Sequence, residues 1–217
     1  MGFENVGKVW DEVSFAEFVK TQDLSWAKGI TIHHTANPHH GNRPRGLTIQ
    51  HIRNIQSGYE RKRPNPWRSG PHLFTDEDQI FGMSSLERRG VHAKSFNGTH
   101  IGIEVLGNYD TVDPLTDERG NRCWATAVAT TAILIQSAPT LTVSGINGHR
   151  DDPRTDKTCP GKKWDMDKFR ANVTAYLSAD GRDREDDPAE AKVIDVEGIH
   201  KAIAAIEWQL SKLKNAL

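Results

Sequence analysis

Two histidines and one cysteine have the side chains that bind a metal ion, and they come from two distant parts of the chain. His33 lies near the end of a stretch rich in β-branched residues, whereas His149 and Cys159 belong to the polar stretch 148–161, which also contains Lys157. A borderline-soft ion such as Zn²⁺ binds neutral imidazole and thiolate. A hydrolytic zinc site uses three protein ligands and leaves a fourth position to water. The pattern therefore predicts a catalytic metal site.

Strand alternation indicates which histidine is the ligand. In the strand expected over 29–35, Ile30, Ile32 and His34 share one face, and His33 lies on the other with two threonines. We therefore expect His33 to bind the metal and His34 to pack among its neighbours. The strand expected over 99–107 sends three apolar residues to the core, which places Glu104 on the opposite face.

The elements that must position these residues alternate between strands and helices. Residues 72–75 and 79–81 predict a hairpin around a short acidic turn. Apolar residues at helical spacing predict a helix capped by Ser14 and ending near residue 21, one from about Thr48 to Ser57-Gly58, one over 122–137 and one over 166–177. This order predicts an α/β fold with a mixed central β-sheet flanked by helices, in a catalytic domain of residues 1–180.

Charge and composition exclude several classes of protein. With 28 basic and 29 acidic residues and a pI near 6.8, the chain has no general basic field for nucleic-acid binding. No apolar run reaches the ~18 residues of a membrane span. The N-terminus lacks a positive flank and apolar run, so we expect synthesis in the cytoplasm without a signal peptide. Cys123 and Cys159 are expected to be separate thiols and not a disulfide.

Two segments follow the catalytic domain. Residues 181–192 are highly charged and have little to bury, which predicts a linker. Beyond them, apolar residues from Val196 to Leu217 recur at alternating spacings of three and four, so residues 193–217 are expected to form an amphipathic helix. A coiled coil that makes a homo-oligomer is favoured, although Gly198 weakens the pattern. Packing of the helix on its own domain is the alternative.

Several short motifs occur in a definite order along residues 25–178. They are Ile32-His33-His34-Thr35-Ala36, Gly70-Pro71-His72-Leu73-Phe74, His92-Ala93, Ile101-Gly102-Ile103-Glu104, and Gly148-His149-Arg150 with Lys157-Thr158-Cys159-Pro160-Gly161. Each is weakly specific alone, but the ordered set resembles the zinc-dependent N-acetylmuramoyl-L-alanine amidases of the type-2 amidase and peptidoglycan-recognition-protein superfamily. That superfamily includes many phage endolysins.

The resemblance implies a role for each residue of the site. It makes His33, His149 and Cys159 the Zn²⁺ ligands. Glu104 corresponds to a carboxylate that takes a proton from water and passes it to the leaving nitrogen, and Lys157 to a lysine that stabilises the oxyanion. Another branch of the family has a tyrosine one residue before the equivalent of His72. Pro71 stands at that position here, which favours Glu104 as the proton acceptor.

Three further residues are candidates for substrate binding. The resemblance places His92 in the substrate groove, and the basic, aromatic loop 60–70 adds Trp67 and Arg68. Four other polar residues receive no metal-binding role: His39 and His40, which are expected to be solvated, and Asp151 and Asp152, which are expected to hold the loop through backbone hydrogen bonds.

The predicted activity is hydrolysis of the amide between N-acetylmuramic acid and L-alanine in peptidoglycan by zinc-activated water. The expected lack of a signal and the heptads favour an endolysin-like enzyme that reaches the cell wall after release, since multivalency raises retention on a polymer. The alternatives are a cytoplasmic amidase that recycles wall fragments, a zinc peptidase acting within the stem peptide, and a non-catalytic peptidoglycan-binding module. The presence of all three candidate ligands argues against the binding module.

Overall fold

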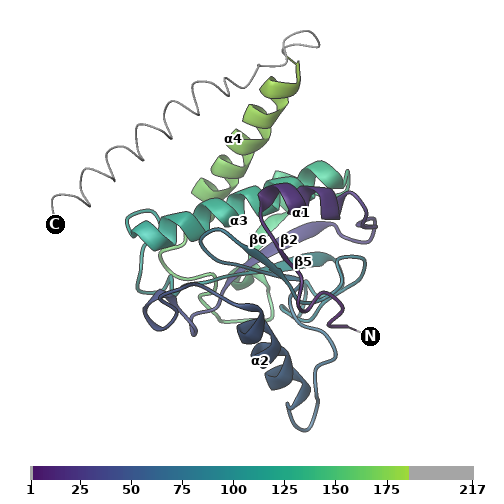
Figure 1. The fold of residues 1–217 in the computed structure, drawn as a ribbon, viewed down its shortest axis with the longest axis vertical. Coiled ribbons are helices and arrows are strands. Elements are labelled where there is room, and N and C mark those ends of the chain that lie inside the picture. Colours follow the sequence, from purple (N-terminus) through teal and green to yellow (C-terminus); the bar gives the residue numbers. More distant parts are fainter. Residues whose placement is uncertain (1, 186–217) are drawn as a thin grey trace, which may run out of the picture. The chain divides into compact units, whose positions relative to one another are not determined.

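The structure, a computed structural model, describes residues 2–185 and has a six-stranded sheet at its centre (Figure 1). The strand order is β1-β4-β3-β5-β2-β6. Strands β3, β5, β2 and β6 run parallel to one another, whereas β4 is antiparallel to β3 and β1. The strands are β1 Val9–Trp10, β2 Gly29–His34, β3 Leu73–Thr75, β4 Ile80–Gly82, β5 His100–Val105 and β6 Ile146–Gly148.

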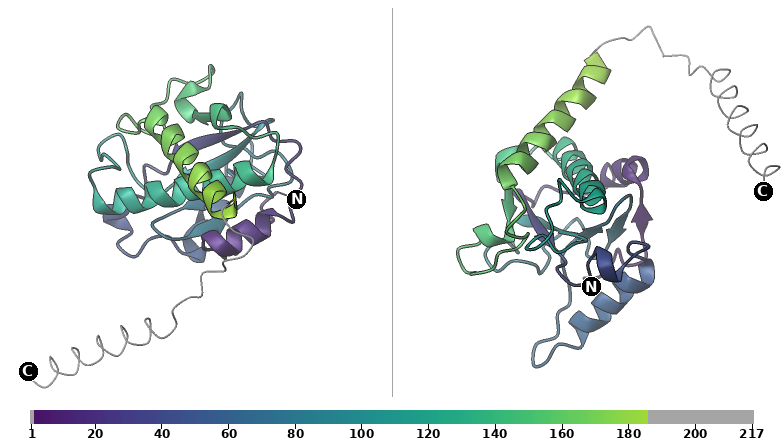
Figure 2. Two further views of the ribbon diagram at one scale, coloured as in Figure 1. Left: turned by 90° about the horizontal axis from the view of Figure 1, so that it is seen from above. Right: turned by 90° about the vertical axis from the view of Figure 1, so that its left-hand side faces the viewer.

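Helices cover both faces of the sheet. Helices α1, α3 and the first part of α4 lie on one face and α2 lies on the other (Figures 1 and 2). The helices are α1 Glu12–Val19, α2 Ile49–Glu60, α3 Glu118–Ser137 and α4 Met166–Glu185, and the short 3-10 turns are η1 His40–Asn42, η2 Val143–Gly145 and η3 His149–Asp151. This arrangement confirms the predicted mixed sheet flanked by helices.

The apolar face of the two central strands forms the core, as alternation predicts. Ile30, Ile32, Ile101 and Ile103 are essentially inaccessible to solvent. Burying each such side chain contributes about 1.5–3 kcal/mol, so this face determines which way both strands are turned. Because the apolar residues face the core, the alternate residues His33 and Glu104 must face the side that carries α2.

Helix α3 closes the core with a stripe of large and small side chains. Trp124 packs against Trp164 and Phe169, with ring centroids 4.4 and 5.1 Å away, and its indole N–H donates to Asn172 on α4. Cys123 on the same helix is buried and unpaired, as is Cys159, which confirms two separate thiols.

Several element boundaries differ from the sequence-based expectations. Asp11, and not Ser14, is the N-cap of α1, and Ser14 completes the capping box from position N3. Helix α2 continues through Gly58 to Glu60 because a glycine in an exposed helix costs only about 1 kcal/mol. Strands β1 and β6 were not predicted, because segments of two and three residues show no periodicity and neither is marked by a hairpin turn as β3 and β4 are.

The C-terminal predictions fall mostly beyond the described part of the chain. Helix α4 extends to Glu185 and so includes the beginning of the segment 181–192 that was expected to be a linker. The rest of that segment and the expected heptad helix of residues 193–217 lie outside the described residues. Within residues 2–185, no helix is both long enough and apolar enough to cross a membrane.

Candidate metal centre and active site

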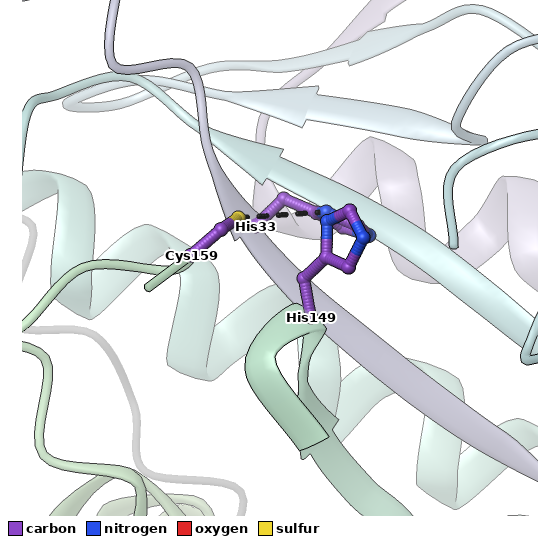
Figure 3. Close-up of side chains that lie close together, drawn as sticks. All are labelled: His33, His149 and Cys159. Atoms are coloured by element: carbon purple, nitrogen blue, oxygen red, sulfur yellow. Dashed lines mark hydrogen bonds between the residues drawn. The ribbon is translucent and has the colours of Figure 1, made fainter. Parts of the chain in front are cut away.

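Three side chains from separate segments converge at one end of the sheet, as Figure 3 shows. The ligand atoms that His33, His149 and Cys159 offer lie within 4.8 Å of one another. The Nδ1 atom of His33 is 3.6 Å from the Sγ atom of Cys159, and the rings of the two histidines are 4.7 Å apart. All three side chains are at least nine-tenths buried.

Parallel pairing explains why these residues meet. His33 is the penultimate residue of β2, and His149 directly follows β6, which pairs with β2 in parallel. The carboxyl ends of parallel strands lie at the same edge of a sheet, where α/β proteins commonly bind ligands. On the other side of β2, strand β5 places Glu104 directly opposite His33. Paired residues share a face of the sheet, so Glu104 lies beside the cluster.

Arg150 joins the two halves of the loop that carries His149 and Cys159. Its guanidinium donates to the carbonyls of Gly161 and Trp164, both at 2.8 Å, and its backbone N–H donates to the carbonyl of Cys159 at 2.7 Å. The planar fork of arginine suits two carbonyl acceptors at once. The sequence motif contains this residue, but its role was not predicted because it depends on where residues 161 and 164 fold back.

We expect Arg150→Met to loosen this loop and lower the free energy of unfolding by about 2–3 kcal/mol, because two charge-assisted hydrogen bonds are lost and two carbonyls are left unpaired. Chemical denaturation measures the effect. Arg154→Met is the matched control, since the Arg154 side chain is exposed and donates to the Ser95 hydroxyl, and the change should alter stability by less than about 0.5 kcal/mol. Equal effects for both variants would contradict this role for Arg150.

The two aspartates of the loop hold its backbone, as the sequence indicates. Asp151 accepts from the N–H of Gly148 at 2.7 Å. Asp152 accepts from the N–H groups of Ser95 and Arg154 at 2.8 and 2.9 Å, and these bonds help to keep the pKa of its carboxyl below the usual range. The Asp152 bond attaches the ligand loop to the segment that carries His92.

Glu104 has the burial and position of a proton-transfer group. Its Oε1 atom is 3.9 Å from Nδ1 of His33, and its side chain is only 16% exposed. Burial raises the pKa of Glu104 to about 8, and the ammonium of Lys157 opposes this shift. A carboxylate whose pKa is raised toward neutrality is a stronger proton acceptor than an ordinary surface glutamate.

The chemistry of the three donors fits a zinc ion. Burial lowers the pKa values of His33 and His149, so both imidazoles are neutral at pH 7 and able to bind a metal. Burial and the nearby Glu104 raise the pKa of the Cys159 thiol, so a thiolate at this place requires a cation beside it. The backbone N–H of His34 also points at this sulfur, 3.4 Å away, and would support its negative charge.

A cavity of about 900 Å³ adjoins the cluster. All three candidate ligands line it, together with Glu104 and Lys157, so a substrate amide can approach the metal position and both charged side chains. Helix α2 forms part of the opposite wall through Ile55, Gly58 and Tyr59. The continuation of α2 beyond Gly58 therefore shapes the site, which the sequence did not predict.

The candidate substrate-binding residues lie in different places. Trp67 lines the cavity, where it stacks on Tyr59 at a centroid distance of 4.8 Å and has the Nζ atom of Lys62 3.6 Å from its ring centre. Arg68 is exposed and does not line this cavity. The wall formed by Tyr59 and Lys62 was missed, although Tyr59 directly precedes the aromatic loop and Lys62 lies within it.

Other histidines surround the site without joining the ligand cluster. His92 lines the cavity but also contacts His33, and burial lowers its pKa to about 3. His34 is packed as expected and accepts from the backbone N–H of Tyr109. His40 is largely buried, with its Nε2 atom 3.4 Å from Cys123, so the expectation that it is solvated was wrong, whereas His39 caps η1.

The fold and the site together define an α/β protein with a mixed sheet, whose polar groups gather around a candidate metal centre of two histidines and one cysteine. Residues 23–162 match the family described as N-acetylmuramoyl-L-alanine amidase. This range covers more than half of the chain and contains all the candidate ligands. The chain therefore belongs to the N-acetylmuramoyl-L-alanine amidase family, which confirms the predicted activity of a peptidoglycan amidase.

Solved structures share the fold. The catalytic domain of XlyA aligns with a TM-score of 0.51 and 24% identity, covering 69% of this chain and 88% of that chain. A mutant endolysin from Bacillus subtilis aligns with a TM-score of 0.50 and 24% identity, covering 69% and 87% of the two chains. A selenomethionine AmpD derivative aligns with a TM-score of 0.51 and 22% identity, covering 68% of this chain and 84% of that chain. Comparison with curated protein sequences gave no match.

Proposed function

We propose that this amidase holds Zn²⁺ with His33, His149 and Cys159. The observation that carries the proposal is the convergence of three buried ligand atoms, within 4.8 Å of one another, beside a cavity that is also lined by an acid and a lysine. When bound there, Zn²⁺ supplies Lewis-acid chemistry, because it acidifies water and polarises an amide carbonyl at neutral pH.

Glu104 is proposed to carry the proton between water and the leaving group. Its carboxylate accepts a proton from the attacking water as the new C–O bond forms. It then donates that proton to the alanine nitrogen as the C–N bond breaks. The products are a free lactyl carboxylate on muramic acid and a free amine on L-alanine. The register with His33 supports this role, because it holds the carboxylate next to the ligands.

Lys157 is proposed to stabilise the negative charge that develops on the carbonyl oxygen. Its side chain lines the cavity, and its positive charge acts on both Glu104 and the histidine ligands. Trp67 and Arg68 are proposed substrate contacts, Trp67 within the cavity and Arg68 beyond it.

Lys157→Met should lower kcat by about 10²–10³-fold, the usual effect of removing one group that stabilises an oxyanion, and should leave KM and zinc content nearly unchanged. Steady-state kinetics on solubilised peptidoglycan fragments, with metal analysis of each preparation, measures this. Lys163→Met is the control, because Lys163 is an exposed lysine that does not line the cavity. An unchanged kcat would remove the oxyanion role from Lys157.

Mass spectrometry of digested peptidoglycan tests the proposed bond. We expect glycan strands with intact N-acetylmuramic acid and stem peptides that begin with a free L-alanine amine. Peptides cut internally, with L-alanine still attached to the sugar, would instead identify a peptidase. Metal analysis of the protein purified without chelators should find about one zinc per chain. Active protein that contains no zinc would contradict the zinc proposal.

We also propose an endolysin-like role on the bacterial cell wall. The likeness to a mutant endolysin in fold and the wall polymer as substrate support it. In that case, a culture of cells that produce the protein keeps its optical density until the cell membrane is opened, for example with chloroform. The cells then lyse and the optical density falls. Lysis without membrane opening would contradict the need for a separate release step.

A further inference from the structure

His92 lies between a candidate metal ligand and the backbone of the central sheet. Its Nδ1 atom is 3.1 Å from Nε2 of His33, and the two rings are nearly perpendicular with centroids 5.2 Å apart. Its other nitrogen, Nε2, is 3.0 Å from the carbonyl oxygen of His100 on β5. The three groups thus form a continuous hydrogen-bonded chain that ends at a ligand of the metal centre.

The chemistry of these groups sets the direction of the chain. A carbonyl oxygen only accepts, so Nε2 of His92 carries a hydrogen and donates to His100. A neutral imidazole has one N–H, which leaves Nδ1 of His92 as an acceptor. It can therefore accept only if Nε2 of His33 carries the hydrogen. The lone pair of His33 is then on Nδ1, the atom that lies 3.6 Å from Cys159 Sγ in the ligand cluster.

The surrounding chain holds the His92 ring in this place. Asn97 accepts from the backbone N–H groups of His92 and Ala93 at 2.7 and 2.9 Å, which fixes the start of the loop. Gly102 on β5 leaves room for the ring, because an added Cβ would lie 2.6 Å from Cγ of His92. A side chain at position 102 would displace the ring, since the strand backbone cannot retreat within a paired sheet.

We propose that His92 is a positioning residue of the metal centre, which fixes the tautomer and ring orientation of His33, in place of the substrate-binding role that its sequence motif suggests. Outer partners of metal-binding histidines commonly orient the ring and raise its basicity. The proposal rests on the proposed function to the extent that His33 binds zinc. The tautomer itself is a property of the protein alone.

Zinc affinity and ring tautomer test the proposal. In metal-free wild-type protein, ¹⁵N NMR should show His33 protonated only on Nε2. His92→Phe keeps the ring shape without an acceptor, so we expect a mixture of tautomers and a zinc Kd about 10–100-fold weaker. His92→Asn keeps an oxygen near the position of Nδ1 and should restore most of the affinity and the single tautomer.

A second pair of variants tests the contact between His92 and His33 without replacing a polar side chain. Gly102→Ala should push the His92 ring away from His33 and weaken zinc binding to a similar extent. Gly98→Ala is the matched control, because an added Cβ there meets nothing within 4 Å, and its zinc Kd and kcat should equal those of the wild type. The NMR measurement on the wild type stands even if a variant fails to fold.

The outcomes separate this proposal from the proposed function. Active wild-type protein that binds no zinc would overturn the proposed zinc function. Zinc-binding wild-type protein with His33 protonated on Nδ1 would overturn only the role of His92. So would a folded His92→Phe variant with unchanged zinc Kd and a raised KM, since that result identifies a substrate contact.

Discussion

Cys159→Ser is expected to lose bound zinc and amidase activity together. A serine hydroxyl is a much poorer zinc ligand than a thiolate, so two imidazoles alone would have to hold the ion. Several kcal/mol of transition-state stabilisation depend on the metal in such sites. We therefore expect kcat/KM to fall by about 10³-fold or more. Metal analysis and peptidoglycan hydrolysis on the same preparation measure both effects.

Cys123→Ser is the matched control for this variant. Cys123 is also a buried free thiol, but it lies on α3 against His40 and away from the ligand cluster. We expect a lower free energy of unfolding, since a hydroxyl is placed in the core, with zinc content unchanged. Full activity in Cys159→Ser, or equal zinc loss in the two variants, would overturn the metal centre described above.

Glu104→Gln is expected to separate chemistry from metal binding. Glutamine has nearly the same size as glutamate but cannot accept and return a proton. Since general acid–base groups contribute about 10²–10⁴-fold, kcat should fall by that factor, while zinc content and KM stay close to wild type. Calorimetric zinc titration together with steady-state kinetics distinguishes this result from loss of the metal.

Glu17→Gln controls for the loss of one negative charge. Glu17 is 68% exposed on α1 and pairs with Lys20 on the same helix, so its replacement should leave kcat unchanged. If Glu104→Gln also keeps full turnover, the proton is carried by another group. If it loses zinc, the carboxylate supports the metal centre and not the chemistry.

Much of the fold follows from local patterns. The alternation in residues 29–35 and 99–107 predicted both central strands and the face that each residue takes, because a strand with one buried face must repeat every second residue. The acidic turn between 75 and 79 predicted the hairpin. The alternation favoured His33 over His34, in agreement with the family resemblance, and the structure places His33, and not His34, in the ligand cluster.

Other features depended on which segments meet in three dimensions. The pairing of His33 with Glu104 joins residues 71 positions apart and requires the register between β2 and β5. The contact from His92 to His33 depends on packing of the His92 ring against Gly102 on β5, where the absence of a side chain leaves room for it. Neither relation leaves a periodic signal, since periodicity reports only which face of one element is buried.

The sequence by itself determined the residue types, their order and the faces of the strands, and therefore the family and the candidate ligands. The tertiary structure decided what each group contacts. Arg150 bonds two carbonyls across the ligand loop, and α2 lines the cavity. His92 contacts His33 instead of open solvent. The physical reason is that hydrophobic alternation acts along one segment, whereas hydrogen bonds and burial at the site join segments that only the folded sheet brings together.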